Sequence, residues 1–147
     1  DPVHGLPGSV RFREALNESE DLFIVSFSPF LDDTSAMADL ILPDRVYLED
    51  WGDDIPEPGP GFQVVGFQQP VVNPLSDLNP RSFPDLLLTA SQELGLDDGL
   101  PNSFRDVLRE GARKLFELDR GSVDATSFEE FWNGVLQQGG TNQLNLH

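Results

Sequence analysis

Few residues of this chain have the type and spacing that enzyme chemistry requires. Its two histidines are His4, in an expected loop, and His147, the last residue, so neither lies on an expected rigid element. The sequence has no GxSxG, HExxH, Walker or GxGxxG pattern. Adjacent acidic residues occur at Asp32-Asp33, Asp53-Asp54, Asp97-Asp98 and Glu129-Glu130. In so acidic a chain, such pairs are typical of solvated caps and loops, and we predict no catalytic residue.

A calcium site is the alternative raised by the segment from Lys114 to Trp132, which has the pattern helix, acidic loop, helix. An EF-hand loop needs oxygen ligands at positions 1, 3 and 5, glycine at position 6 and glutamate at position 12. Counted from Asp119, the third, fifth and sixth positions hold glycine, valine and aspartate, and Glu130 falls at the twelfth. The pattern therefore indicates a helix–loop–helix, and no metal ligand is predicted.

Composition excludes several classes of function. The chain has 26 acidic and 9 basic residues and a net charge of −17, which disfavours nucleic-acid and anionic membrane-surface partners. Cysteine is absent, so this chain holds no disulfide and no cysteine-bound iron–sulfur cluster. No apolar run approaches the ~18 residues of a membrane span. Because the chain starts at Asp1 without a methionine, we expect a processed product or a part of something longer.

The elements that would position functional residues alternate in type over the first part of the chain. Ser9 is expected to cap a short helix. The apolar runs 22–27 and 40–42 are typical of strands covered on both faces, and Pro43 ends the second. Between them, Asp32 or Asp33 is expected to cap a turn over 34–38. This order of strand, helical turn and strand predicts a parallel sheet with crossover connections.

Regular structure thins out from Pro43 to Pro80. The run EDWGDDIPEPGPG predicts an irregular acidic loop, and 62–68 and 69–72 are expected to form two short extended strands. Trp51 and Trp132 are expected in a core or at an interface.

The C-terminal third is predicted to be helical. One helix opens at 82–84 and ends at Gly95, and the next is capped by Asn102 or Ser103. A capping box at Ser127 opens the last helix, and Gly139-Gly140 closes it. The predicted fold class is α/β. We expect residues 1–80 to form a partial Rossmann-like α/β unit with a long loop, and residues 81–147 to form a helical extension.

One set of motifs resembles a known family. The residues that carry the resemblance are Asp1-Pro2, Phe30, Thr34, Ala38-Asp39, Leu42-Pro43 and Leu48-Glu49, with QPVVNPL at 69–75, PDLLLTASQELG at 84–95 and FEEFWNGVLQQGG at 128–140. In this order they resemble the third domain of the molybdopterin oxidoreductases of the dimethyl-sulfoxide-reductase type. The resemblance covers nearly the whole chain but only a small part of such a protein. It is strongest with the molybdoenzyme-like large subunit of alternative complex III.

This resemblance implies which residues would contact a cofactor. Molybdopterin guanine dinucleotide would be held by Asp1, Pro2, Ser26, Ser28 and Thr34, at the carboxyl ends of the parallel strands. The family usually has an acidic residue where Ser28 stands, and an asparagine where Asp1 stands. The subunits of alternative complex III have lost the pterin and relay electrons through iron–sulfur clusters, which agrees with the missing carboxylate at Ser28. The opposing possibility, that these loops only pack against other domains, stays open.

The resemblance also implies a function for the parent protein. The chain is expected to be a fragment of a respiratory electron-transfer subunit and to be inert alone. No cofactor is expected in the fragment, whereas molybdopterin and an iron–sulfur cluster are options for the parent. Its partners would be the remaining domains and the subunits of a respiratory complex. That complex would attach to a membrane through partner subunits, with the periplasmic side as one option. The alternative is a stand-alone acidic protein-binding module without a redox role.

Overall fold

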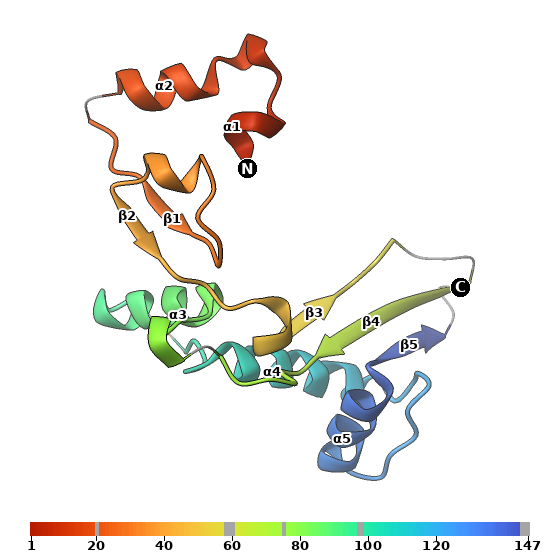
Figure 1. Ribbon diagram of the computed structural model, residues 1–147. Coiled ribbons are helices and arrows are strands. Elements are labelled where there is room, and N and C mark those ends of the chain that lie inside the picture. Colours follow the sequence, from red (N-terminus) through yellow and green to blue (C-terminus); the bar gives the residue numbers. More distant parts are fainter. Residues whose placement is uncertain (20, 58–60, 75, 97–98, 145–147) are drawn as a thin grey trace. The chain divides into compact units, whose positions relative to one another are not determined.

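The computed structural model describes residues 1–19, 21–57, 61–74, 76–96 and 99–144 (Figure 1). Contacts group the chain into two compact units. The first combines Asp1–Val46 with Pro74–Phe83, and the second combines Tyr47–Asn73 with Pro84–His147. The predictions that concern Asp97, Asp98 and His147 fall outside the described residues.

The first unit is built around a parallel pair of strands, β1 (Val25–Phe27) and β2 (Leu40–Leu42). Val25 lies opposite Leu40 and Phe27 opposite Leu42. The predicted parallel pairing and the α/β fold class are therefore confirmed. The other elements of this unit are the helices α1 (Pro2–Gly5) and α2 (Phe12–Glu18) and the 3-10 turns η1 (Gly8–Val10), η2 (Ser35–Met37) and η4 (Ser76–Leu78).

Two local expectations for this unit were wrong. Both strands were expected to be buried, but Val25, Leu40 and Ile41 are exposed, because no layer of the described residues covers both faces of so small a sheet. Ser9 was expected to cap the first longer helix. That helix instead starts at Phe12, after Arg11 in a left-handed conformation (φ 50°), without a side-chain cap. A Rossmann-like sheet stays a prediction, because the crossover contains only the single turn η2.

The second unit is a three-stranded antiparallel sheet packed with helices. Strand β4 (Phe62–Gln68) lies between β3 (Gly52–Asp54) and β5 (Gly140–Leu144). The helices are α3 (Phe83–Glu93), which begins at the boundary of the units, α4 (Phe104–Glu117) and α5 (Phe128–Gln138), and η3 (Tyr47–Glu49) precedes β3.

The prediction of an irregular acidic loop is wrong for part of its length. Part of the acidic run, 52–54, is a strand, because its backbone pairs with β4. Glu49 is only 9% exposed. No strand forms at 69–72, where a second extended strand was expected. The partner of β4 on its other side is β5, far along the chain.

The predicted side-chain caps of α4 and α5 are confirmed, but the Glu130 carboxylate bonds Thr126 in place of the Ser127 N–H that a capping box uses. Ser103 accepts a hydrogen bond from the N–H of Asp106, and Ser127 accepts one from the N–H of Glu130. The Glu130 carboxylate turns to the N–H and hydroxyl of Thr126, both at 2.9 Å. These two hydrogen bonds hold the pKa of Glu130 below its ordinary value. Gly139 ends α5 with a left-handed conformation (φ 76°) that suits glycine.

The hydrophobic core of the described residues lies in the second unit. Trp132 is 3% exposed and stacks on Trp51 at 6.2 Å between ring centroids, and Phe67 meets it edge-on at 5.6 Å. Burial of each such side chain contributes about 1.5–3 kcal/mol. The expected core role of both tryptophans is confirmed. The buried core residues are Val65, Phe67, Leu108, Ala112, Phe128, Phe131, Trp132 and Val135.

The contact units differ from the expected division at residue 80. Residues 47–73 join the C-terminal helices because β4 pairs with β5. Units defined by contacts are not the domains of a whole protein, so the division into 1–80 and 81–147 stays a prediction.

The close pairing of β4 with β5 can be tested at Gly140. A Cβ there would collide with the Val65 carbonyl oxygen, so we expect Gly140→Ala to lower the free energy of unfolding by about 1–3 kcal/mol. The matched control is Gly111→Ala on α4, where a Cβ meets nothing within 4 Å and should raise stability by up to ~1 kcal/mol. Urea unfolding followed by tryptophan fluorescence measures both. Equal effects of the two changes would contradict the close pairing.

Candidate functional site

The Thr34 hydroxyl joins the N-terminal segment to the β1–β2 crossover. The Thr34 hydroxyl donates a hydrogen bond to the Asp1 carboxylate and accepts one from the N–H of Val3 at 3.0 Å. Proline at the start of α1 is favourable because the first helical N–H needs no partner. Three residues expected at the site, Asp1, Pro2 and Thr34, are thus brought together across 33 positions of sequence.

The crossover turn is shaped by Asp32. Its carboxylate accepts a hydrogen bond from the N–H of Ser35 at 2.6 Å, which confirms the expected cap. Ser35 is 3% exposed and its hydroxyl accepts a hydrogen bond from Ser26 at 2.8 Å. Hydrogen bonding to the backbone of Ser35, then to its side chain, lowers the pKa of Asp32 below the ordinary 3.8, and the N-terminal ammonium adds to this effect.

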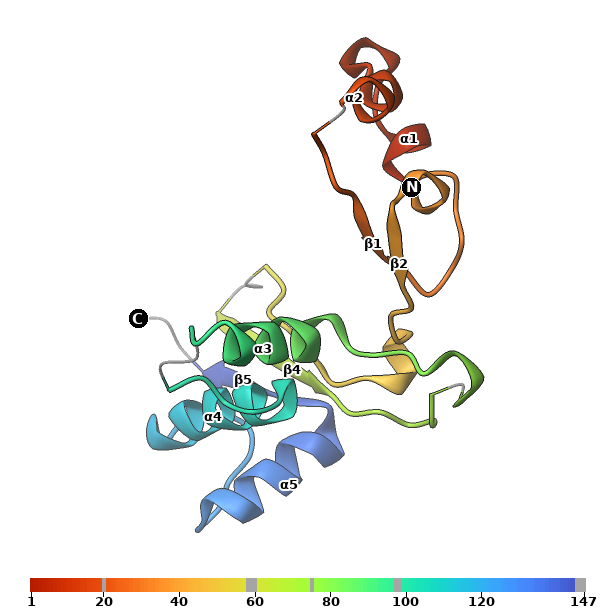
Figure 2. The same ribbon diagram turned by 90° about the vertical axis from the view of Figure 1, so that its left-hand side faces the viewer.

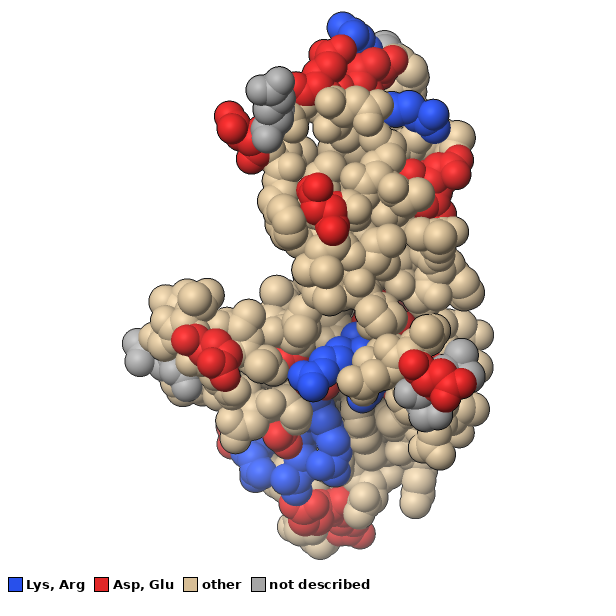
Figure 3. Space-filling view, turned by 60° about the vertical axis from the view of Figure 1, so that its left-hand side comes forward, with Lys and Arg blue, Asp and Glu red and all other residues tan. Residues whose placement is uncertain are grey.

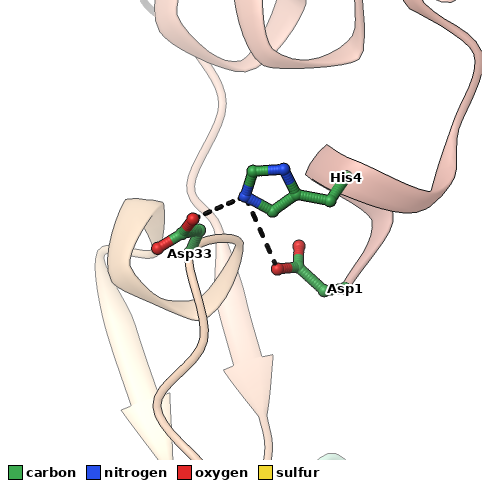
Figure 4. Close-up of side chains that lie close together, drawn as sticks. All are labelled: Asp1, His4 and Asp33. Atoms are coloured by element: carbon green, nitrogen blue, oxygen red, sulfur yellow. Dashed lines mark hydrogen bonds and ion pairs between the residues drawn. The ribbon is translucent and has the colours of Figure 1, made fainter.

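A histidine and two carboxylates meet beside this joint (Figure 4). His4 Nε2 lies 2.5 Å from the Asp33 carboxylate and 4.0 Å from that of Asp1. One ligand atom from each residue falls within 4.8 Å of the others, a spacing that a metal ion could bridge. All three residues are exposed, which is common for acidic groups without an ion. Sequence reasoning missed His4 and Asp33, because nothing in their local sequence indicates a contact 29 positions apart.

Ser28 makes its hydrogen bonds elsewhere. Its hydroxyl donates to the carbonyl of Phe30 at 2.6 Å and accepts from the N–H of Phe30 at 3.2 Å, a local turn beyond the end of β1. Figures 1 and 2 show the arrowheads of β1 and β2 pointing away from the N-terminus of the chain. The expected residues therefore do not all gather at the carboxyl ends of the strands.

The cofactor that the resemblance implies would need a ribose anchor among the five residues expected at the site. A dinucleotide fold holds the ribose with a carboxylate at a strand end. Ser28 supplies no carboxylate, and its hydroxyl is used both as donor and as acceptor within its turn. The Thr34 hydroxyl is likewise used in both directions. The Ser28 and Thr34 hydroxyls do not fit a ribose anchor, because hydrogen bonds within the chain already engage them. Cofactor contact at Asp1, Pro2, Ser26, Ser28 and Thr34 stays a prediction.

The joint at Thr34 can be tested by hydrogen exchange. Thr34→Val removes the hydroxyl at nearly constant volume, so the Val3 amide loses its acceptor. One hydrogen bond contributes about 1 kcal/mol, and we expect the Val3 amide to exchange about fivefold faster. Thr89→Val is the control, since that hydroxyl bonds only within its own helix, to the Asp85 carbonyl at 2.9 Å. Unchanged exchange at Val3 would show that the hydroxyl does not hold the N-terminal segment.

The pKa of Asp32 gives a second test. Because the pKa in the folded chain is below 3.8, ionised Asp32 stabilises the fold above that pH. The contribution is lost as the pH falls through the folded pKa. A carbon NMR titration of the carboxyl group should give a midpoint below 3.8, and Ser35→Ala should move it upward while the backbone hydrogen bond remains. A midpoint at or above 3.8 would refute the capped turn.

The chain is 36% identical over 108 residues to the molybdopterin-binding-like subunit of menaquinone reductase from Nitratidesulfovibrio vulgaris (strain Hildenborough). The matched residues make up 74% of this chain, and the chain spans about 15% of that relative's length. No protein-family model matches the chain, and no solved structure matches it.

Among the described residues, no helix has the length and apolar character needed to cross a membrane. The sequence similarity supports a relationship of this chain to the molybdopterin oxidoreductases.

Proposed function

We propose that this chain is a segment of a molybdopterin-oxidoreductase-like respiratory subunit that takes part in quinone-linked electron transfer. The observation that carries the proposal is the 36% identity to a subunit of a menaquinone reductase. The segment is inert in isolation, and its place in the large subunit of an assembly like alternative complex III is part of the proposal. That assembly attaches to a membrane through its other subunits.

The residues that carry the family resemblance also make structural hydrogen bonds in the first unit. The Asp39 carboxylate accepts a hydrogen bond from the N–H of Ile24 at 2.8 Å, at the start of the strand pair. The Pro43 carbonyl accepts one from the N–H of Arg81 at 3.1 Å, which holds the segment Pro74–Phe83 against the end of β2. Together with the Thr34 joint, these contacts give the residues of the motif a structural role in this chain.

The exposed apolar surface of the first unit agrees with a place inside a larger subunit. Phe23, Phe30 and Leu31 are 68%, 72% and 74% exposed. Surface of this kind indicates contact with other protein. We propose that the remaining domains of the subunit cover it. In this role the crossover and its N-terminal joint position the strand pair, while iron–sulfur clusters elsewhere in the subunit carry the electrons.

The electron-transfer role can be tested in the whole organism. Deletion of the gene should abolish one menaquinone-linked reductase activity of isolated membranes, and the full-length gene should restore it. The measurement is the rate of reduction of a soluble menaquinone analogue. Unchanged membrane activity after deletion would refute the redox role and would favour a stand-alone acidic binding module.

Metal analysis of the full-length protein tests whether the turn at Ser28 contacts a pterin in the proposed subunit. We expect Ser28→Ala to leave the molybdenum and tungsten content unchanged, because the Ser28 hydroxyl is engaged within its own turn. Loss of either metal in this variant, at unchanged protein yield, would show that the pterin contacts this region.

A further inference from the structure

The basic residues of this acidic chain are concentrated on one helix. Four of the nine lysine and arginine residues lie on α4, whose sequence is FRDVLREGARKLFE. Three of them, Arg105, Arg109 and Arg113, recur every fourth residue and so share one face of the helix. Figure 3 shows lysine and arginine side chains gathered in a patch over the helical part of the second unit. These three residues are called the arginine stripe below.

Aromatic rings of the core hold the stripe in place. The Arg105 guanidinium lies 5.3 Å from the ring centroid of Trp51. The guanidinium groups of Arg109 and Arg113 lie over the Phe128 ring, at 5.3 Å and 3.9 Å from its centroid. Phe128 is 8% exposed and belongs to the core, so this ring is a fixed support. Stacking of this kind orders the guanidinium groups before any partner binds, which lowers the entropic cost of binding.

Much of the charge on the stripe is uncompensated. Arg109 is paired with Glu129. Neither Arg105 nor Arg113 makes an ion pair with any residue that the structure describes, although both are exposed. In a chain with a net charge of −17, acidic groups to pair with them are abundant. What sets Arg105 and Arg113 apart is the aromatic ring that orders each of them, since Arg13, Arg81 and Lys114 also make no ion pair with any residue that the structure describes.

We infer that the arginine stripe binds a short acidic segment of a partner polypeptide. A guanidinium group donates two parallel hydrogen bonds to a carboxylate, and a stacked guanidinium presents its edge for this geometry. From Arg105 to Arg113 the stripe is about 12 Å long at 1.5 Å per residue. Two or three carboxylates of one segment match this length. The inference rests on the proposed function in one respect, because it takes the partner to be another subunit of the same assembly.

Nucleic acid and anionic membranes fit this surface less well. A DNA duplex carries one charge per ~1.7 Å along its whole length, and an anionic membrane carries charge over its whole surface. Either would extend past the stripe and meet the acidic residues beside it, among them Asp106, Glu110 and Glu129. Repulsion from a chain of charge −17 would oppose both. A short acidic segment touches the stripe alone.

The first experiment measures binding of a fluorescent ten-residue oligoglutamate to the full-length protein. Arg113→Glu and Lys114→Glu make the same change of charge on neighbouring residues, but Lys114 does not belong to the stripe face. We expect Arg113→Glu to weaken binding about tenfold and Lys114→Glu less than about twofold, at low salt. Arg113→Lys keeps the charge without the planar fork and should give an intermediate loss. Circular dichroism of each variant verifies the fold.

Equal losses for Arg113→Glu and Lys114→Glu would overturn the inference, because only net charge would then matter. Tighter, stripe-dependent binding of a ten-residue oligothymidylate or of phosphatidylglycerol vesicles would also overturn it. None of these results bears on menaquinone-linked activity, so failure of the inference is distinguishable from failure of the proposed function.

The second experiment identifies the source of the acidic segment. Phenylglyoxal, an arginine reagent, is applied to the full-length protein alone and to its purified assembly, and modified peptides are quantified by mass spectrometry. We expect Arg105 and Arg113 to react in the protein alone and to be protected in the assembly, while Arg13 reacts equally in both. Protection in the protein alone would place the occupant in the same polypeptide, and reactivity in both would show that nothing binds. Either result overturns the assignment to a partner subunit.

Discussion

The parallel pairing of two three-residue strands is the constraint on which the first unit depends. So short a pair leaves backbone groups without partners at both ends, and those groups must be satisfied. At the start, Ile24 exchanges hydrogen bonds with Asp39, through the backbone at 2.9 Å and through the Asp39 carboxylate at 2.8 Å. At the far end, the Ser28 N–H donates to the Leu42 carbonyl at 3.4 Å. The crossover turn and the docked N-terminal segment both depend on this closure.

The two units are stabilised by different interactions. All the buried hydrophobic residues among those described belong to the second unit, where tryptophan stacking and a helix–sheet interface exclude water. In the first unit the buried side chains include Ser35 and Ser82. Hydrogen bonds to the crossover turn and to the segment Pro74–Phe83 hold this unit together. A fold held in this way leaves its apolar strands exposed. That property agrees with the proposed place of the chain inside a larger subunit.

The charge distribution of the chain and the packing of its core meet at the arginine stripe. In a chain with a net charge of −17, the arginine stripe is an ordered basic face of the described residues, on a helix that packs against the core. Phe128 of the core and Trp51, which packs against the core, also support the guanidinium groups. Stability of the second unit and presentation of the stripe are therefore coupled through the same rings.

Local sequence determined the features that depend on neighbouring residues. The caps at Asp32, Ser103 and Ser127 and the glycine stop at Gly139 follow from hydrogen bonds and dihedral angles within a few positions. The motif order also predicted the parallel strand pair and the relationship to molybdopterin oxidoreductases. Tertiary structure alone decided that 52–54 and 140–144 are strands, that Thr34 holds Asp1, and that His4 meets Asp33. These pairings join residues distant in sequence, and their free energy comes from backbone groups and charges that no local pattern records.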